Sequence, residues 1–240
     1  MIHPHLEKEK FHWEQGRKFV AGIDEAGRGP LAGPVVAGAV IVRPDIIDEI
    51  KNTPEFKIIR DSKTLSEKQR EKAYDFITRH FQWGVGISDE KTIDRINILQ
   101  AAFLAMKKAI SDLKSKIKCE PEIILVDGRS PVPNISIFQE SIVGGDKFVF
   151  SISAASIIAK VTRDRMMLDF HEKYPVYGFA KHKGYGTKMH FEMIGKYGLC
   201  EIHRKSFKFP GNPNIKAQMS NQAQNQKYKY PLSFSHSDLI

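Results

Sequence analysis

The sequence predicts an α/β domain with a mixed sheet, and three observations lead to that fold class. Several short apolar runs are bounded by Gly, Pro or Asp and have the length of buried strands. Longer segments between them repeat apolar residues at helical spacing, so strands and helices alternate and at least one crossover joins two strands. Hydrophobic residues form 41% of the 240, enough for the core of one substantial domain.

Four apolar runs are predicted to be strands. The first two, residues 18–23 and 33–42, are separated by a turn rich in Gly and Pro, and the third covers residues 82–88. The fourth, residues 122–126, ends at Asp127 before a glycine, a pair of residues typical of turns.

Two predicted helices have recognisable beginnings. Ser66 starts a capping-box pattern that Gln69 completes, so we expect a helix from there to about Phe81. Asn97 begins an amphipathic helix whose apolar residues recur at i, i+3 and i+4 spacing, namely Ile98, Ala101, Ala102, Ala105, Met106, Ala109 and Leu113.

Two further helices are predicted over residues 151–170 and 187–197, and Gly198 ends the second. Between them, residues 175–186 form a loop rich in Gly and Pro. Residues 43–60 carry two prolines and mixed charges, so we expect a loop there as well.

The chain is expected to consist of an N-terminal extension over residues 1–17, one domain over 18–210 and a tail over 211–240. The tail holds eight Asn or Gln between Gly211 and Gln226 and little that could build a core. It is therefore predicted to be flexible.

The formal net charge is +9, which suits a polyanionic partner such as nucleic acid. The surplus is concentrated in residues 181–208, where seven Lys or Arg face Glu192 and Glu201, a balance of +5 (7 − 2). Tyr and His residues are interleaved with these charges. This segment is the candidate for contacts to a nucleic-acid backbone, and the alternative is an ordinary solvated basic face.

No apolar run is long enough to span a membrane, and the first ten residues lack the apolar core of a secretory signal. We therefore expect a cytoplasmic protein. Cys119 and Cys200 lie far apart and form no CxxC pair, so two reduced thiols are expected rather than a disulfide or a zinc site.

Acidic residues follow two of the predicted strands. Asp24 and Glu25 end the first, Asp127 ends the fourth, and Asp146 lies nineteen residues further on (146 − 127). Carboxylates at the ends of adjacent strands can converge, and their mutual repulsion raises their pKa values unless a cation restores ionisation. Mg²⁺ or Mn²⁺ suits such oxygen ligands, and two ions can catalyse phosphodiester hydrolysis. For Asp127 or Asp146 alone, a cap or turn role is the stronger alternative.

Other chemistries lack their motifs. The glycines at positions 27, 29 and 33 miss the GxGxxG spacing by one residue, and there is no GxxxxGK[ST] loop. His171-Glu172 is not part of an HExxH motif, and no G-x-S-x-G elbow is present. The remaining histidines, His182, His190 and His203, are expected at the surface or at phosphates rather than as metal ligands.

Seven segments, in family order, resemble the type 2 ribonuclease H family, ribonuclease HII, over roughly residues 18–210. They are AGIDEAGRGPLAGPVVAGAV (21–40), DSKTLSEKQR (61–70), ILVDGR (124–129), GGD (144–146), SAASIIAKVTRDR (153–165), YGFAKHKGYGT (177–187) and HRKSF (203–207).

The resemblance implies a ribonuclease H-like fold, a mixed five-stranded sheet flanked by helices with a smaller C-terminal helical part. It also implies an endoribonuclease that hydrolyses the RNA strand of RNA–DNA hybrids. The enzyme would cut 5′ to single ribonucleotides in duplex DNA, as in ribonucleotide excision repair, leaving 3′-OH and 5′-phosphate ends. Its cofactor would be Mg²⁺ or Mn²⁺, with two ions when substrate is bound, and we expect a monomer.

The resemblance further implies a role for each matching residue. The metal-binding, catalytic carboxylates would be Asp24, Glu25, Asp127 and Asp146. The turn that reads the 2′-hydroxyl, where glycine lets the backbone approach the sugar, would be Gly27, Arg28 and Gly29. The tyrosine under the sugar at the RNA–DNA junction would be Tyr185, and the phosphate contacts would be Lys63, His182 and Lys183.

Two alternative functions remain open. The related ribonuclease HIII type shares most of these motifs but normally carries an additional N-terminal substrate-binding domain. A catalytically inactive nucleic-acid-binding module could use the basic segment 181–208 alone, although intact carboxylates near phosphates argue against it. In the tail, residues 230–234 faintly resemble a peptide that docks on a sliding clamp, and the alternative there is an uninvolved tail.

Overall fold

The structure is a computed structural model that describes residues 3–117 and 120–209. Its centre is a five-stranded sheet of order β3-β2-β1-β4-β5. β1 is antiparallel to β2, and β2 to β3, whereas β4 is parallel to both β1 and β5. The strands are β1 Val20–Ala26, β2 Val35–Val42, β3 Gln82–Ser88, β4 Ile123–Asp127 and β5 Gln139–Ile142. The expected mixed five-stranded sheet is confirmed.

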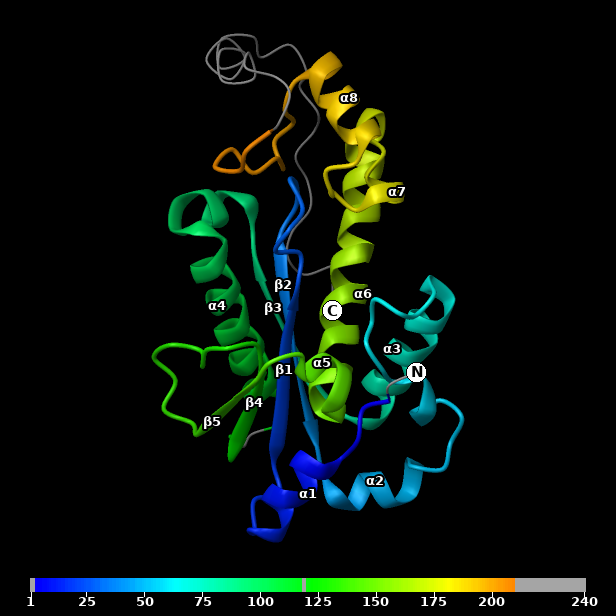
Figure 1. Ribbon diagram of the computed structural model, residues 1–240, viewed down its shortest axis with the longest axis vertical. Helices are drawn as coiled ribbons and strands as arrows, with labels where there is room; N and C mark the ends of the chain where they lie inside the picture. Colours follow the sequence, from blue (N-terminus) through cyan, green and yellow to red (C-terminus); the bar gives the residue numbers. More distant parts are fainter. Residues whose placement is uncertain (1–2, 118–119, 210–240) are drawn as a thin grey trace.

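Helices cover both faces of this sheet (Figure 1). The long helix α4, Glu90–Ile117, lies on one face, and α6, Phe150–Lys173, lies on the other together with α3, Glu67–His80. Shorter helices surround them: α1 Glu7–Glu14, α2 Pro44–Ile50, α5 Gly145–Phe148, α7 Phe179–His182 and α8 Lys188–Tyr197. Single 3₁₀ turns are η1, Phe56–Ile58, and η2, Pro175–Tyr177.

Strand glycines let the two long helices approach the sheet closely. A Cβ on Gly22 of β1 would lie 2.2 Å from the carbonyl carbon of Ser151, and one on Gly38 of β2 would lie 2.4 Å from the Ala155 oxygen. Gly84 and Gly86 do the same for α4 on the opposite face. Backbone therefore packs almost directly on backbone at these points, which only glycine allows.

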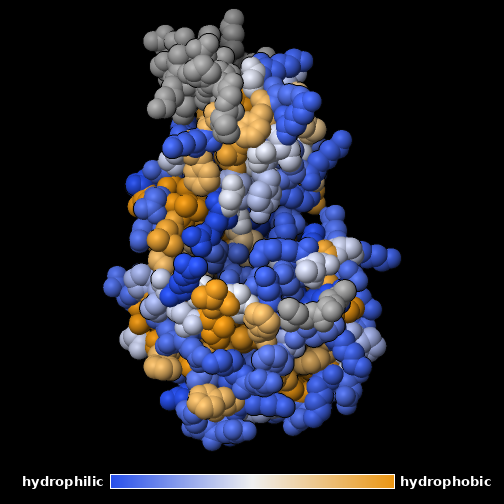
Figure 2. Space-filling model, in the orientation of Figure 1, coloured by the Kyte–Doolittle hydropathy of each residue, from blue (hydrophilic) through white to orange (hydrophobic). Residues whose placement is uncertain are grey.

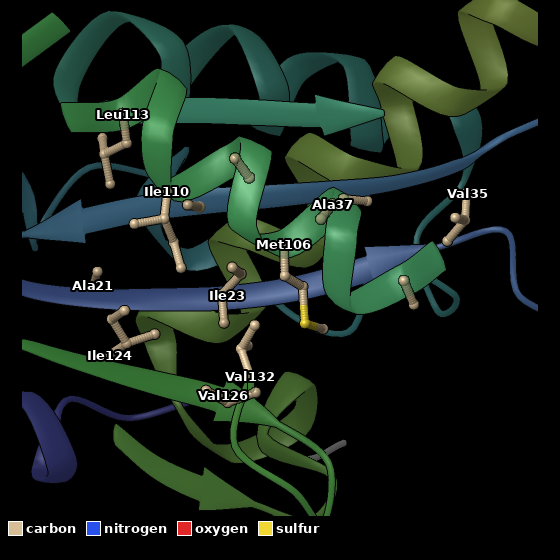
Figure 3. Packing of buried hydrophobic residues seen from close by; sticks show 14 of the residues in the cluster. Ala21, Ile23, Val35, Ala37, Met106, Ile110, Leu113, Ile124, Val126 and Val132 are labelled. Atoms are coloured by element: carbon tan, nitrogen blue, oxygen red, sulfur yellow. The ribbon is translucent and has the colours of Figure 1, made fainter. Parts of the chain in front are cut away.

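The core between the sheet and α4 is built from small and branched side chains (Figure 3). Met106, Ile110 and Leu113 of α4 pack on Ile23 of β1 and Ile124 of β4. This confirms the apolar face predicted for the helix that follows Asn97.

Local signals in the sequence are visible at both predicted helix beginnings. Ser66 and Gln69 form the reciprocal capping box at the start of α3. Asn97 lies within α4 but has a φ of 65°, and its side-chain oxygen accepts hydrogen bonds from the N–H groups of Leu99 and Gln100. Asn97 thus caps the predicted helix, and a further helical segment precedes it across the kink.

Helix α1 in the predicted N-terminal extension packs against the domain. Its Glu9 is fully buried, and one carboxylate oxygen accepts a 2.7 Å hydrogen bond from the Ser151 N–H in the first turn of α6. Burial raises the pKa of this carboxyl. Glu9 therefore caps a helix from elsewhere in the chain and satisfies one of the amides that a helix start leaves free.

Two expectations need comment. Residues 43–60 were expected to form a loop, and this is wrong, because α2 and η1 occupy much of the segment; Pro44 stands in the first turn of α2, where proline is tolerated. The tail over 211–240 lies outside the described residues, as does its clamp-like peptide.

Hydrophilic residues cover most of the face seen in Figure 2, with hydrophobic ones in small separate patches. Of the helices within the described ranges, none combines the length and apolarity that crossing a membrane requires.

We expect Gly86→Ala to lower the free energy of unfolding by about 1–3 kcal/mol, because its Cβ would lie 2.0 Å from the Ala105 oxygen. Urea denaturation measures this. The control is Gly195→Ala in α8, where a Cβ has no neighbour within 4 Å; it should leave stability unchanged or raise it slightly. Equal stability of the two variants would contradict the close packing of α4 on β3.

Candidate active site

The parallel pairing of β1 with β4 brings two of the predicted acids side by side. Ile23 pairs with Val126, so the next residues along the two strands are Asp24 and Asp127. Along β1 and β4, Val20, Ile123 and Leu125 pack with Val149 and Ile152 at the start of α6. Because side chains alternate along a strand, Asp24 and Asp127 lie on this same α6 face.

Asp146 joins them from α5, which follows β5 through a left-handed glycine at 144. The Asp146 N–H donates to the Asp127 carboxylate over 3.4 Å, and the Ser153 hydroxyl donates to the Asp146 carbonyl over 2.7 Å. Asp24 and Asp146 are 4% and 3% exposed, so both carboxylates are held inside the protein.

Because side chains alternate along β1, Glu25 points to the opposite face of the sheet from Asp24. Its charge still interacts with Asp24 and Asp127. Its N–H donates to the Asp24 carboxylate over 2.7 Å, and its own carboxylate accepts from Arg28 over 3.2 Å. The structure therefore gathers all four predicted carboxylates at one end of β1 and β4.

The pKa values of three of these carboxyls are raised. Burial is the main cause for Asp24, whose pKa lies well above its usual value, and repulsion from Glu25 and Asp127 adds to it. Burial also dominates for Glu25, where Arg28 works in the opposite direction. For Asp127, burial and the charge of Asp146 both raise the pKa.

Lys63 supplies positive charge at the same place. Its ammonium donates a 2.9 Å hydrogen bond to Asp146. Burial by itself would lower the pKa of Lys63, but this bond and the attraction of Asp146 and Asp24 raise it overall. The ammonium thus stays charged and partly neutralises the carboxylates.

The donor set fits a hard divalent cation. Within residues 3–117 and 120–209, no three His, Cys, Asp or Glu side chains are arranged so that they could hold a metal ion together. The group nevertheless offers only oxygen donors, and three of its carboxyls carry raised pKa values that a nearby cation would lower. Mg²⁺ and Mn²⁺ prefer such ligands and retain part of their water shell, so a partly open group suits them.

The glycine-rich turn after β1 is held by two buried arginines. Arg204 donates to the carbonyls of Gly27, Arg28 and Gly33 at 2.6 to 3.0 Å. Gly27 has a φ of +99°, and a Cβ there would lie 2.2 Å from Nε of Arg163. The turn thus needs glycine both for its backbone angle and for the space that the arginine fills.

Tyr185 lies beside this turn. Its side chain is 46% exposed, and its Cε1 atom would be 3.7 Å from a Cβ on Gly29. The N–H of Leu31 donates to the carbonyl of Gly184 over 2.8 Å and so ties the two loops together. The structure therefore places Tyr185 beside Gly29 of the glycine-rich turn.

The expectation for His182 needs correction. His182 is 8% exposed, its Nδ1 accepts from the Gly184 N–H, and its Nε2 donates to the Tyr177 carbonyl over 2.7 Å. Both ring nitrogens are therefore engaged inside the protein, and none is left for a phosphate. His190 and His203, expected near the surface, are also buried.

The basic segment 181–208 is only partly a surface feature. Its exposed cations are Lys181, Lys188, Lys196, Lys205 and Lys208. Lys183 is half-buried and donates to the Ala180 carbonyl over 2.7 Å. Arg204 is fully buried, so it is wrong to count it among backbone contacts for nucleic acid.

Sequence reasoning missed the structural importance of Arg163 and Arg204. Arg163 donates to the carbonyls of Ala32, Pro34 and Lys183 at 3.0 to 3.1 Å. No local signal distinguishes Arg163, because Lys160, Asp164 and Arg165 stand close to it in the same helix.

The sequence matches the family model "Ribonuclease HII" over residues 21–209. It is 54% identical over 200 residues to ribonuclease HII of Acetivibrio thermocellus, covering 83% of this chain and 73% of that protein. The crystal structure of ribonuclease H2 from Pyrococcus horikoshii OT3 superposes with a TM-score of 0.64 at 28% identity, over 84% of this chain and 98% of that one.

A structure of Bst-RNase HIII in complex with Mn²⁺ shares the fold, with a TM-score of 0.65 at 18% identity over 87% of this chain and 71% of that one. Between the two related types, the family model and the relative from Acetivibrio thermocellus both favour type HII. The chain belongs to the ribonuclease HII family, and it is a metal-dependent nuclease that hydrolyses the RNA strand of RNA–DNA hybrids.

Proposed function

We propose that this enzyme also incises duplex DNA 5′ to a single embedded ribonucleotide and leaves 3′-OH and 5′-phosphate ends. We assign the metal site to Asp24, Glu25, Asp127 and Asp146. This assignment is supported by the register of β1 and β4, which places Asp24 next to Asp127 on the sheet face covered by α6. Asp146 lies at the same face and donates its N–H to Asp127.

Mg²⁺ or Mn²⁺, two ions with substrate bound, would supply the Lewis acidity for in-line displacement at a phosphodiester. The chain's own residues do the rest. The buried carboxylates of Asp24 and Asp146 fix ligand oxygens inside the protein, where electrostatic interactions are stronger than in water. Arg28 and Lys63 offset part of the negative charge, so that an anionic phosphate can approach.

Substrate selection is assigned to the glycine-rich turn and Tyr185. Recognition of a ribose 2′-hydroxyl is assigned to Gly27, Arg28 and Gly29: the missing side chain of the exposed Gly29 lets the sugar approach, whereas the buried Gly27 packs on Arg163 and shapes the turn. The half-exposed ring of Tyr185 beside Gly29 would pack under the sugar at the RNA–DNA junction. Lys63 and Lys183 are proposed as phosphate contacts, and His182 is not.

The location, oligomeric state, repair role and clamp docking of the enzyme are proposals as well. We expect the enzyme to act in the cytoplasm as a monomer in ribonucleotide excision repair. Docking on a sliding clamp through residues 230–234 would need the tail, and a pull-down comparing full-length and tail-deleted protein tests it. Equal recovery of the clamp would end the idea.

The test of the proposed function is to map the cut in a DNA duplex that contains one ribonucleotide. We expect cleavage on the 5′ side of the ribonucleotide with Mg²⁺ or Mn²⁺ and none with EDTA. Cleavage of continuous RNA–DNA hybrids alone would keep the metal site but refute single-ribonucleotide incision. Binding without cleavage under either metal would favour the inactive binding module.

Asp24→Asn should lower the cleavage rate by more than about 100-fold, since even residues that only support metal ligands cost 10- to 100-fold when lost. Steady-state cleavage of an RNA–DNA hybrid measures this. The control is Asp48→Asn on α2, whose carboxylate pairs with Lys51 at the exposed surface; it should retain full activity. A fully active Asp24→Asn enzyme would contradict the site assignment.

In EDTA at pH 8, the same Asp24→Asn variant should melt at a higher temperature than the wild type. Asp24 has a raised pKa in the folded state, so its ionisation above that pKa destabilises the wild type, and the amide removes this cost. Each kcal/mol corresponds to about 2–4 °C for a chain of this size. The difference should shrink as the pH falls toward the unfolded-state value near 3.8, and a constant difference would refute the assigned cause.

A further inference from the structure

The backbone that carries Tyr185 is held at each residue by buried groups. The carbonyl of Lys183 accepts from Arg163 over 3.0 Å, and the N–H of Gly184 donates to Nδ1 of His182 over 3.2 Å. The carbonyl of Tyr185 lies 2.9 Å from Nδ1 of His190. Since a carbonyl cannot donate, His190 must carry its proton on Nδ1 and donate it to Tyr185.

This tautomer determines those of its neighbours. With Nδ1 protonated, Nε2 of His190 is an acceptor, and it lies 3.0 Å from Nε2 of His203. His203 must therefore donate from Nε2, which leaves its Nδ1 to accept the Cys200 N–H over 2.9 Å. His182 stacks on His190 with ring centroids 4.4 Å apart. The three imidazoles form one neutral, internally consistent network.

Burial keeps this network neutral. It lowers the pKa of His190 to about 4 and that of His203 to about 3, and neighbouring histidines contribute in the same direction. Neither ring can therefore serve as a general acid or base at neutral pH. A role through hydrogen bonding is what remains for them.

Electrostatic interaction links the Tyr185 side chain to Arg163 and Arg204. Across the part of the chain that the structure describes, its hydroxyl has no hydrogen-bond partner and its ring forms no aromatic pair. A Cβ added to Gly29 would lie at ordinary van der Waals distance from the ring. The direction of the ring thus depends largely on how its backbone is held. The Tyr185 N–H donates to the His182 carbonyl and the Tyr185 carbonyl accepts from the Thr187 N–H, both over 2.9 Å, and His190 is the buried side chain that bonds to the same carbonyl.

We propose that His190 is a positioning residue that holds Tyr185 against the glycine-rich turn and thereby sets the preference of the enzyme for an RNA–DNA junction. The inference rests on the proposed function, because it gives Tyr185 the junction-reading role. It extends the proposed function from Tyr185, which would contact the substrate, to the buried histidine network that holds Tyr185. Helices α7 and α8, which carry His182 and His190, lie at the C-terminal end of α6 (Figure 1).

The experiment compares kcat/KM on two substrates, a DNA duplex with one ribonucleotide and a continuous RNA–DNA hybrid, with Mg²⁺. His190→Leu removes the donor. It should lower the ratio of kcat/KM on the single-ribonucleotide duplex to kcat/KM on the hybrid about fivefold, as expected from losing one hydrogen bond. His190→Asn can place an amide N–H near the position of Nδ1 and should retain most of the ratio. Tyr185→Ala gives the largest loss that the network can produce.

Two controls separate positioning from general destabilisation. Tyr177→Phe removes a buried 2.9 Å hydrogen bond to the Gly198 carbonyl in the same subregion without touching residues 183–185; it should leave the ratio unchanged. The double variant Tyr185→Ala/His190→Leu should show the same ratio as Tyr185→Ala alone, because His190 is proposed to act only through Tyr185.

The proposal is overturned if His190→Leu lowers both activities equally, if Tyr177→Phe shifts the ratio as much, or if the double variant loses more than Tyr185→Ala. Should His190→Leu fail to fold, His190→Asn and His190→Gln decide, since only Asn can retain the ratio. A wild type that cuts the hybrid but not the single ribonucleotide refutes the proposed function, and this inference with it.

Discussion

Helix α6 can lie close to β1 and β2 because Gly22 and Gly38 present no side chains to it, and the site depends on this contact. α6 begins four residues after Asp146 (150 − 146), beyond α5, and the Ser156 side chain of this helix offsets part of the rise that burial causes in the pKa of Asp24. One helix thus delivers groups to the carboxylates at its beginning and Arg163 to the glycine-rich turn further along. A shift of its axis would displace both together.

Arg163 and Arg204 are almost completely buried, yet their donors bond to backbone carbonyls rather than to carboxylates. Burial lowers their pKa values, to about 10 for Arg163 and about 9 for Arg204. Both remain charged at neutral pH, and each planar guanidinium group donates hydrogen bonds to the carbonyls of several loop residues. The arginines thus tie the loops together beside the apolar cluster that contains Leu31, Met167 and Phe179.

Much of the fold could be predicted because its signals are local: the capping box at Ser66, the cap at Asn97 and the apolar runs of β1 to β4. β5 has no such signal, since Gln139–Ile142 is a half-buried edge strand without an apolar run. Asp24, Glu25 and Asp127 could be assigned to strand ends from the sequence, although their meeting with each other and with Asp146 of α5 depends on contacts between distant segments. His182 and Arg204 were misjudged because residue type alone does not reveal whether a polar group is buried.

The parallel partner of β1 is β4, which follows it by about a hundred residues in the chain, whereas β2 follows after a short turn. During synthesis, β1 can pair with β2 at once, but its other edge stays open until β4 has left the ribosome. Such long-range pairings form slowly and leave an exposed edge in the meantime. The nascent chain therefore passes through a period in which it can aggregate. The site formed by Asp24, Glu25, Asp127 and Asp146 is among the last parts of the molecule to be assembled.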